Sequence, residues 1–297
     1  MKVLILGGSG MLGHKLWQVL ASRFDTYVTL RRGFNSYKQY KLFDKARSID
    51  HVSAEDFDSV ARAIAESKPD VVVNCIGIVK QAEAANDSLV SIEINALFPH
   101  RLAKSCQGRG MRLIHISTDC VFSGRKGNYL ENDVSDAEDL YGRTKFLGEV
   151  HYRDCMTIRT SMIGRELETS NGLIEWFLNQ EDKTISGYKK SVFSGFTTNA
   201  LAEIIAGIIT KNPELHGVWH VASEPISKFE LLSLVKQVYG LNIRIEPDET
   251  VVCDRSLNSE RFRKVTGFVP PTWHDMIEQM YRDSTPYSKL RRHHADQ

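Results

Sequence analysis

The chain has 297 residues, of which 42% are hydrophobic and 25% are charged. This composition is typical of a folded globular protein, and the length predicts one main domain with a smaller one appended. Because 38 Lys and Arg residues are balanced by 37 acidic residues, no excess positive charge is present to attract nucleic acid or an anionic membrane. The expected partner is therefore a small molecule.

The cysteines and the apolar runs predict a cytoplasmic protein. The five cysteines are scattered and form no CxxC pair, which indicates reduced thiols rather than a zinc site. No HxxxH or HxH pair falls on a predicted helix, so no metal is expected. The first apolar run ends at Gly7 after four residues, and no later run approaches the roughly twenty apolar residues of a membrane span.

Residues 1–165 alternate short β-branched runs with amphipathic windows, the pattern of a parallel sheet covered by helices. A helix with apolar positions between 57 and 64 is entered through Ser53 and Asp56 and ends before Pro69. The predicted fold class is therefore α/β, a Rossmann-type doubly wound parallel sheet. The six predicted strands are 3–6, 27–30, 49–52, 71–75, 113–117 and 156–159.

After residue 165 the alternation becomes less regular. Ser227 with Glu230 predicts a capping box at the start of one helix. We assign residues 1–165 to a Rossmann domain that binds NAD(P) and residues 166–285 to a smaller C-terminal α+β substrate-binding domain, leaving open whether segments of the second return to the first. Residues 286–297 are predicted to form a flexible tail. The predicted helices of the second half are 173–178, 201–210, 229–239 and 273–281, with an extended run at 218–221.

A glycine-rich turn follows the first predicted strand directly. Gly7 permits a tight turn, Gly10 lets the backbone approach a pyrophosphate, and Gly13 lets the following helix pack on the strand. The spacing is GxxGxxG rather than GxGxxG, and three glycines alone also occur in ordinary loops. Their position straight after a strand favours dinucleotide binding.

Arg31 and Arg32 follow the second predicted strand, where a protein that selects NAD commonly has an acidic residue. Two guanidinium groups suit the 2′-phosphate of NADP through charge-assisted hydrogen bonds. A solvated basic loop would have the same sequence, but the position favours NADPH and leaves NADH open.

The fourth predicted strand is fully apolar and ends in Asn74, Cys75, Ile76 and Gly77. Such an ending is expected where the carboxyl edge of a sheet meets a ligand. A plain strand-to-loop turn is the alternative, and the neighbouring motifs favour cofactor contact by these four residues.

The strongest constellation joins Ser117, Thr118 and Asp119 at the end of the fifth strand with Tyr141 and Lys145. Tyr and Lys four residues apart lie on one helix face, so the ammonium is expected to lower the pKa of the phenol from its ordinary value of about 10. Such a tyrosine can give a proton to a ketone oxygen that Thr118 holds in place. A YxxxK pair is common by chance, but the order of these motifs along the chain predicts a reductase.

At these residues the chain resembles the dTDP-4-dehydrorhamnose reductase branch of the extended short-chain dehydrogenase/reductase superfamily. Residues 117–124 are similar to the STDYVFxG signature of that branch, and residues 141–145 to its YGxTK. Similarity at 159–161 and 195–202 extends the resemblance over most of the chain. Cys120 stands where the branch usually has Tyr, Met162 stands where it has Trp, and the loop after Gly77 is shorter.

The resemblance implies NADPH-dependent reduction of a nucleotide-linked 4-keto-6-deoxysugar, in deoxysugar biosynthesis for surface polysaccharide. It implies Thr118, Tyr141 and Lys145 as the catalytic residues, and a homodimer stays open. The expected substrate residues are Lys80, Asp119, Val121 and Phe122. Lys80, Lys189, Lys190 and Arg255 are candidates to bind a diphosphate, although each alone is more often a solvated charge. The expected cofactor residues are Gly7, Gly10, Met11, Leu12, Arg31, Arg32, Asn74, Cys75, Ile76, Gly77, Ser117, Tyr141, Lys145, Thr160, Ser161, Met162 and Ile163.

Two alternatives remain. A nucleotide-sugar epimerase or dehydratase on the same scaffold would retain its cofactor, although a dehydratase is expected to carry an acidic pair after the Thr, where this chain has the single acid Asp119. A non-catalytic NADP-binding subunit, such as the one paired with methionine adenosyltransferase, has no need of the intact trio. Stoichiometric NADPH oxidation by a keto-sugar nucleotide separates the three.

Overall fold

The structure is a computed structural model that describes residues 1–80 and 83–287. A seven-stranded sheet lies at its centre, in the order β11-β6-β5-β4-β1-β2-β3, and every neighbouring pair is parallel. The predicted α/β Rossmann-type fold and its six strands are confirmed, and the extended run near residue 218 adds the seventh strand at the edge. The strands are β1 (Lys2–Leu6), β2 (Asp25–Thr29), β3 (Ser48–Ile49), β4 (Val71–Asn74), β5 (Arg112–Ile116), β6 (Cys155–Arg159) and β11 (Gly217–His220).

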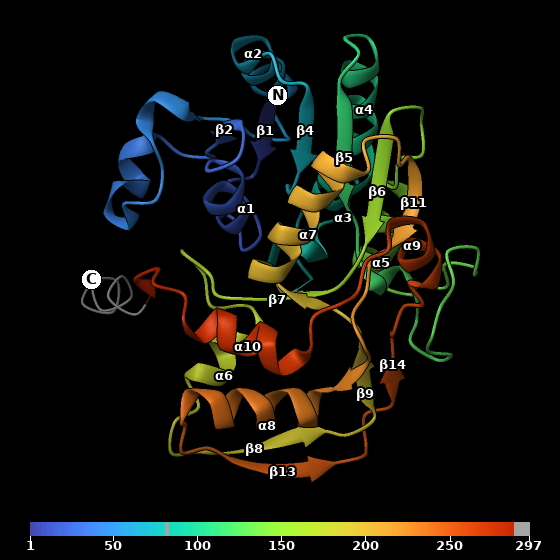
Figure 1. Cartoon of the computed structure of the whole chain (residues 1–297). Helices are drawn as coiled ribbons and strands as arrows, with labels where there is room; N and C mark the ends of the chain where they lie inside the picture. The colour runs from blue at the N-terminus through green and yellow to red at the C-terminus, as the bar shows by residue number, and fades with distance from the viewer. Residues whose placement is uncertain (81–82, 288–297) are drawn as a thin grey trace.

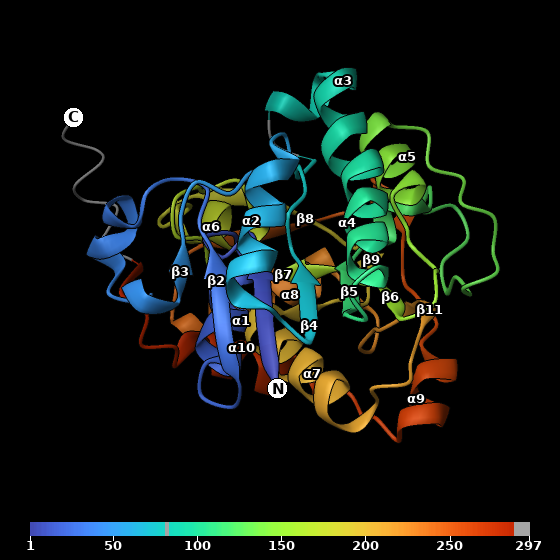
Figure 2. The ribbon, with the colours of Figure 1, turned by 90° about the horizontal axis from the view of Figure 1, so that it is seen from above.

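Helices cover both faces of this sheet (Figures 1 and 2). Because side chains alternate along a strand, Val3 and Ile5 of β1 pack towards one face while Leu4 and Leu6 pack towards the other. The first face is covered by α1 (Gly13–Leu20) and α7 (Thr198–Lys211), and the second by α2 (Phe57–Ser67) and α4 (Phe98–Gln107).

Two local predictions need correction. The third strand ends at Ile49, because His51 takes a left-handed φ of +54° that breaks the strand. Helix α2 begins after Asp56, whose carboxylate accepts from the backbone N–H of Ser59, while the Ser53 hydroxyl bonds Glu55 instead. The β2–β3 connection contains the 3₁₀-helices η1 (Phe34–Tyr40) and η2 (Lys45–Arg47).

The β4–β5 connection and the segment after β5 carry the remaining helices of the first half. The 3₁₀-helix η3 (Glu83–Asn86), α3 (Ser88–Ser91) and the π-helix η4 (Ile92–Leu97) lead into α4. The 3₁₀-helix η5 (Asp119–Val121) follows β5, and α5 (Leu140–Leu147) precedes β6.

A second layer lies below the carboxyl ends of the sheet strands in Figure 1. Strand β7 (Met162–Ile163) pairs with β10 (Phe196–Thr197), β8 (Thr184–Tyr188) with β13 (Arg244–Asp248), and β9 (Ser191–Phe193) with β12 (Ile226–Ser227) and β14 (Cys253–Asp254). The predicted helices are present, and the Ser227–Glu230 capping box is confirmed. The helices are α6 (Leu173–Leu178), α8 (Lys228–Tyr239), α9 (Glu260–Thr266) and α10 (Trp273–Tyr281).

An ion pair and a hydrogen bond join helix α1 to the segment that follows α10. The buried Lys15 ammonium forms an ion pair with Asp283, and the hydroxyl of Tyr287 lies 2.7 Å from His14 Nε2. The other ring nitrogen of His14 lies 2.8 Å from the carbonyl oxygen of Gly10. Of the predicted tail, residues 288–297 lie outside the described residues, and Tyr287 is buried.

No helix within the described ranges has both the length and the apolar character needed to cross a bilayer.

Candidate active site

The turn after β1 has the shape that a pyrophosphate requires. Gly7 has φ +85°, a left-handed conformation that favours glycine. A Cβ atom on Gly13 would lie 2.0 Å from the carbonyl oxygen of Gly7, so α1 begins directly against the turn. A Cβ on Gly7 would lie 3.2 Å from the backbone N of Ile76, which places the turn beside the loop after β4, where the strand order reverses. This backbone allows an anion to approach the N-terminus of α1 closely.

We expect Gly13→Ala to weaken NADPH binding by roughly tenfold, about 1.4 kcal/mol, because the new methyl group must displace the backbone of the turn. Titration by protein fluorescence measures this change. Gly207→Ala is the matched control, since a Cβ there meets no atom within 4 Å and the substitution should leave affinity unchanged while favouring helix α7. Equal affinity in both variants would contradict the close-packing argument.

The residues beyond β2 and β3 fit the adenosine part of NADPH. Arg31 Nη2 lies 3.2 Å from Glu55 Oε2, and Arg32 forms an ion pair with Glu168 of the loop after β7. Both guanidinium groups are more than half exposed and so are accessible to a phosphate. Oδ1 of Asp50 is buried and has no hydrogen-bond partner within the described ranges.

The loop after β4 lies beside the predicted catalytic lysine. Gly77 is exposed, and a Cβ atom there would lie 3.7 Å from Lys145 Nζ. Asn74, by contrast, is fully buried, and its Oδ1 accepts from the backbone N–H of Ile76 at 3.0 Å. The Asn74 side chain therefore holds the loop that follows β4, and the expected cofactor contact of residues 74–77 stays a prediction.

Asn95 in the π-helix η4 is a residue that the sequence interpretation missed. Its Oδ1 accepts from the backbone N–H of Ile78 at 2.9 Å, and its Nδ2 donates to the carbonyl oxygen of Ile78 at 3.4 Å. Asn95 is buried, so a polar residue at an apolar helix position is the signal that could have found it. It fixes the loop that borders Lys145.

Thr118, Tyr141 and Lys145 meet at the carboxyl end of β5. The Thr118 hydroxyl donates to Asp119 Oδ1 at 3.1 Å and accepts from the backbone N–H of Cys120 at 3.1 Å, and Tyr141 lines the same cavity as Thr118. Lys145 is buried, and its Nζ donates to the carbonyl oxygen of Ile116 at 2.8 Å. The hydroxyls of Thr118 and Tyr141 can therefore contact the same ligand oxygen.

Burial shifts the pKa values of both Tyr141 and Lys145. Desolvation raises the pKa of the Tyr141 phenol above its ordinary value, and the Thr118 hydrogen bond opposes that shift. Desolvation also lowers the pKa of Lys145 to about 8, opposed by the Glu149 carboxylate. The net shift of the Tyr141 pKa is upward, because desolvation is its largest cause. Tyr141 thus keeps its proton at neutral pH.

We expect kcat/KM for ketone reduction to fall as the pH rises through about 8, because Lys145 loses its ammonium charge there. Below that pH the residue is protonated and can stabilise the negative charge that forms on Tyr141. Initial rates between pH 6 and 10, with NADPH affinity measured over the same range, check this expectation. A profile that stays flat through pH 9.5 would contradict the assigned charge.

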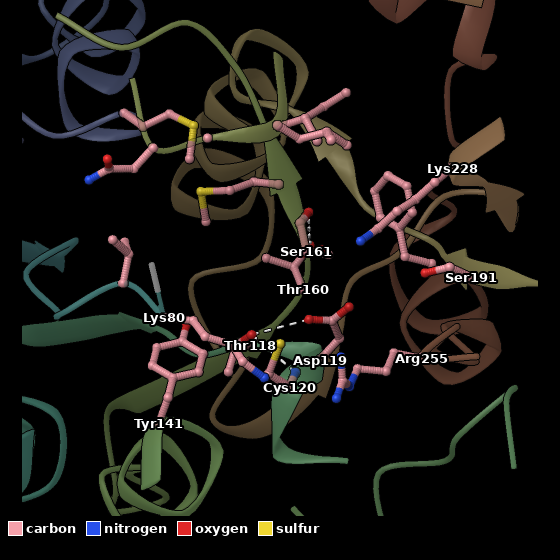
Figure 3. A pocket seen from close by; sticks show the side chains of 18 of the residues that line it. Lys80, Thr118, Asp119, Cys120, Tyr141, Thr160, Ser161, Ser191, Lys228 and Arg255 are labelled. Atoms are coloured by element: carbon pink, nitrogen blue, oxygen red, sulfur yellow. Dashed lines mark hydrogen bonds between the residues drawn. The ribbon is translucent and has the colours of Figure 1, made fainter. Parts of the chain in front are cut away.

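A cavity of about 480 Å³ lies beside this trio, and Figure 3 shows its walls. Tyr141 lies with Thr118 on one side, and Ser191 of β9 and Lys228 of α8 lie on the opposite side. The cavity thus lies between the carboxyl edge of the sheet and the second layer. Among the predicted site residues, it is lined by Met11, Lys80, Ser117, Thr118, Asp119, Tyr141, Thr160, Ser161, Met162 and Ile163.

The other predicted cofactor residues do not line this cavity. They are Gly7, Gly10, Leu12, Arg31, Arg32, Asn74, Cys75, Ile76, Gly77 and Lys145. Met11 belongs to the glycine turn and also lines the cavity. It therefore connects the expected pyrophosphate site with the space beside Tyr141.

Two predicted substrate residues face away from the cavity. Val121 and Phe122 are fully buried, and the Phe122 ring stacks on Tyr129 with centroids 4.2 Å apart. The short helix η5 turns these side chains into a separate apolar cluster with Ala222 and Leu257. The expectation that Val121 and Phe122 face a sugar is therefore wrong.

The charged side chains considered as substrate groups differ in their partners and in whether they line the cavity. Burial raises the pKa of the Asp119 carboxyl, and the Arg255 guanidinium opposes that shift. Arg255 lines the cavity and donates from Nε to the carbonyl oxygen of Phe122 at 2.8 Å. Lys80 is 2.7 Å from Asp139, the N-cap residue of α5. Lys189 and Lys190 both pair with Glu249 and do not line the cavity.

A buried ion pair between Arg159 and Glu149 contacts Ser117, one of the residues that line the cavity. Glu149 accepts from the Ser117 hydroxyl at 2.8 Å, from Arg159 Nε at 2.8 Å and from Arg159 Nη2 at 2.7 Å. Both charged side chains are about 5% exposed or less. Because Glu149 also opposes the lowering of the Lys145 pKa, this pair links the end of β5 to the electrostatics of the trio.

In the ranges 1–80 and 83–287, no three His, Cys, Asp or Glu side chains are grouped so that they could hold a metal ion.

Comparison with known proteins identifies a family and several relatives. The family described as RmlD substrate binding domain matches residues 1–285. The dTDP-4-dehydrorhamnose reductase of Streptomyces griseus is 33% identical over 147 residues, which are 49% of this chain and 43% of that protein. The chain thus spans less than half the length of this relative. The spore coat polysaccharide biosynthesis protein SpsK of Bacillus subtilis is 26% identical over 95% of this chain and 97% of that protein.

Solved structures share the fold over nearly the whole chain. A hypothetical dTDP-4-dehydrorhamnose reductase of Sulfolobus tokodaii superposes with a TM-score of 0.75 at 27% identity, covering 92% of this chain and 98% of that one. The dTDP-4-dehydrorhamnose reductase of Bacillus anthracis, solved in complex with NADP, gives a TM-score of 0.77 at 22% identity, covering 95% and 99%.

Proposed function

The chain belongs to the RmlD substrate binding domain family, and on that premise we propose that it is an NADPH-dependent reductase of the short-chain dehydrogenase/reductase type. Its substrate is a nucleotide-linked 4-keto sugar, which it reduces to the hydroxy sugar. One observation carries the proposal: the hydroxyls of Thr118 and Tyr141 line the same 480 Å³ cavity as Met11 of the glycine turn. A ketone and a nicotinamide can therefore meet there.

The residues that would hold the cofactor follow from their positions. The glycine turn takes the pyrophosphate, Arg31 and Arg32 take the 2′-phosphate, and Gly77 with Lys145 borders the nicotinamide ribose. The segment from Thr160 to Ile163 lines the cavity and would contact the nicotinamide. Bound NADPH supplies the hydride for the ketone carbon.

The protein supplies the proton. Tyr141 gives its phenolic proton to the ketone oxygen as that carbon is reduced, and Thr118 holds the oxygen with its hydroxyl. The phenolate that remains is stabilised by the Lys145 ammonium and regains a proton from solvent, so that one hydride and one proton are added to the ketone. Since burial raises the pKa of Tyr141, the residue is in the proton-donating form before the reaction.

The cavity suits a sugar nucleotide. Lys80, Lys228 and Arg255 line it and would neutralise a diphosphate. Cys120 and Met162 also line it, at positions where the rhamnose enzymes carry Tyr and Trp, so we assign the sugar only as a 4-keto-(6-deoxy)sugar. We propose that this reaction is a step in deoxysugar biosynthesis for surface polysaccharide.

A panel of nucleotide-linked 4-ketosugars, assayed by loss of NADPH absorbance and by product analysis, tests the proposal. We expect one NADPH to be consumed for each ketone reduced. Conversion of a sugar nucleotide without net NADPH consumption would instead indicate an epimerase or dehydratase. NADPH binding without turnover of any panel member would favour a regulatory subunit.

A further inference from the structure

The loop between β7 and α6, residues 164–172, contacts both the adenosine end of the expected cofactor site and the cavity. At one end Glu168 forms an ion pair with Arg32, one of the two arginines expected to bind the 2′-phosphate. At the other end Glu166, Asn171 and Gly172 line the cavity. A residue in this loop can therefore influence which cofactor is accepted.

This loop is held in place by several contacts. The Glu166 carboxylate accepts from the backbone N–H groups of Asn171 at 3.1 Å and Gly172 at 2.6 Å, which closes the loop on itself. The backbone N–H of Glu166 donates to Oε1 of Glu175 in α6 at 2.9 Å. These bonds fix the base of the loop.

The tip of the loop is packed as well. Leu167 is 5% exposed, lies in an apolar cluster with Leu30 and Tyr37, and accepts a hydrogen bond on its carbonyl oxygen from the Tyr40 hydroxyl at 3.3 Å. The backbone of Glu168 therefore follows directly after an anchored residue. From this position its carboxylate forms the ion pair with Arg32.

We propose that Glu168 is a specificity-determining residue that lowers the preference of this protein for NADPH over NADH by occupying Arg32. A 2′-phosphate carries close to two negative charges at neutral pH. To bind Arg32 it must displace the Glu168 carboxylate, and it is repelled by that carboxylate as long as the two stay close. NADH carries a hydroxyl at this position and encounters neither cost.

Glu168 is better placed for this role than Glu55, which pairs with Arg31. The Glu168 side chain is 27% exposed, whereas Glu55 is 43% exposed on an arginine that is itself 72% exposed. Solvent screens the Arg31 pair more strongly. The discrimination should therefore respond to Glu168 more than to Glu55.

The test measures dissociation constants of NADP⁺ and NAD⁺ by calorimetry, without sugar substrate, for the unaltered protein and for Glu168→Gln. We expect NADP⁺ to bind about fivefold more tightly to the variant, the upper range for an exposed ion pair, and NAD⁺ to bind as before. Salt should reduce the difference. Equal changes in both constants, or none, would overturn the proposal.

Two controls isolate the contact. Glu203→Gln removes a carboxylate from the surface pair with Arg23, which does not line the cavity, and should change neither constant. In an Arg32→Ala background, we expect Glu168→Gln to change the ratio of the NADP⁺ and NAD⁺ dissociation constants by clearly less than fivefold. Only the repulsion between the Glu168 carboxylate and the 2′-phosphate remains there. A full fivefold effect in that background would overturn the role of Arg32.

This inference rests on the proposed function only in requiring that the protein bind a nicotinamide cofactor. Failure of the unaltered protein to bind either cofactor would overturn both. Binding of both with an unchanged ratio in Glu168→Gln would overturn this inference and leave the proposed reductase activity intact.

Discussion

Tyr141→Phe is expected to lower kcat for the ketone reduction by about two to four powers of ten, the usual contribution of a positioned general acid. The Tyr141 phenol lines the cavity on the same side as Thr118 and can give a proton to a ketone oxygen held there. Removing its hydroxyl leaves the ring and its packing in place. Initial rates of NADPH consumption with the active ketosugar measure the loss.

Two measurements separate this effect from misfolding. NADPH affinity should stay within about twofold of the unaltered protein, because the glycine turn and the arginines are unchanged. Tyr281→Phe, at a residue that is 54% exposed and distant from the cavity lining, should retain full turnover. Full turnover in Tyr141→Phe would disprove the assigned proton donor.

Glu149→Ala is expected to cost about 3–5 kcal/mol of unfolding free energy, because it leaves the Arg159 guanidinium buried without its carboxylate. Ser117 and the end of β5 lose their support at the same time. Urea unfolding monitored by circular dichroism gives the change in midpoint.

The control for this prediction is an ion pair on the surface. Glu278→Ala breaks the exposed pair with Arg282, 2.8 Å long, and should cost less than about 1 kcal/mol. A similar midpoint shift in both variants would show that burial does not set the strength of the Arg159–Glu149 pair.

The sequence predicts those parts of the site whose roles depend on nearby residues. Strand β1, the glycine turn and α1 follow one another within the first 20 residues, so their arrangement can be read from a local pattern. The same holds for Thr118 and Tyr141, because a residue at the end of a parallel strand and one at the start of the next helix meet at the carboxyl edge of the sheet.

The sequence does not predict contacts that depend on distant segments. Arg255 comes to the cavity from 133 residues beyond the Phe122 carbonyl that it bonds, and Glu168 reaches Arg32 from another layer. Arg255 and Glu168 are both ordinary charged residues when the chain is viewed residue by residue. The pairing is determined by the tertiary fold.

The sequence also does not predict which way the side chains point in the segment after β5. The motif that contains Val121 and Phe122 gives their place in the chain, but the 3₁₀ turn η5 decides which way they point. The spacing of Tyr141 and Lys145 predicts that the two side chains lie close together. It does not predict how strongly desolvation shifts their pKa values.

The fastening of α1 bears on how the protein folds during its synthesis. Lys15 is almost fully buried, yet its partners Asp283 and Thr285 are made some 270 residues later. Until the ribosome has produced them, closing the first helix over the sheet would bury an ammonium without a counter-charge, which is strongly unfavourable. The edge strand β11 likewise joins β6 late in translation. The seven-stranded sheet is therefore complete only after β11 has been synthesised, and earlier nascent forms are expected to expose an unpaired strand edge and apolar surface.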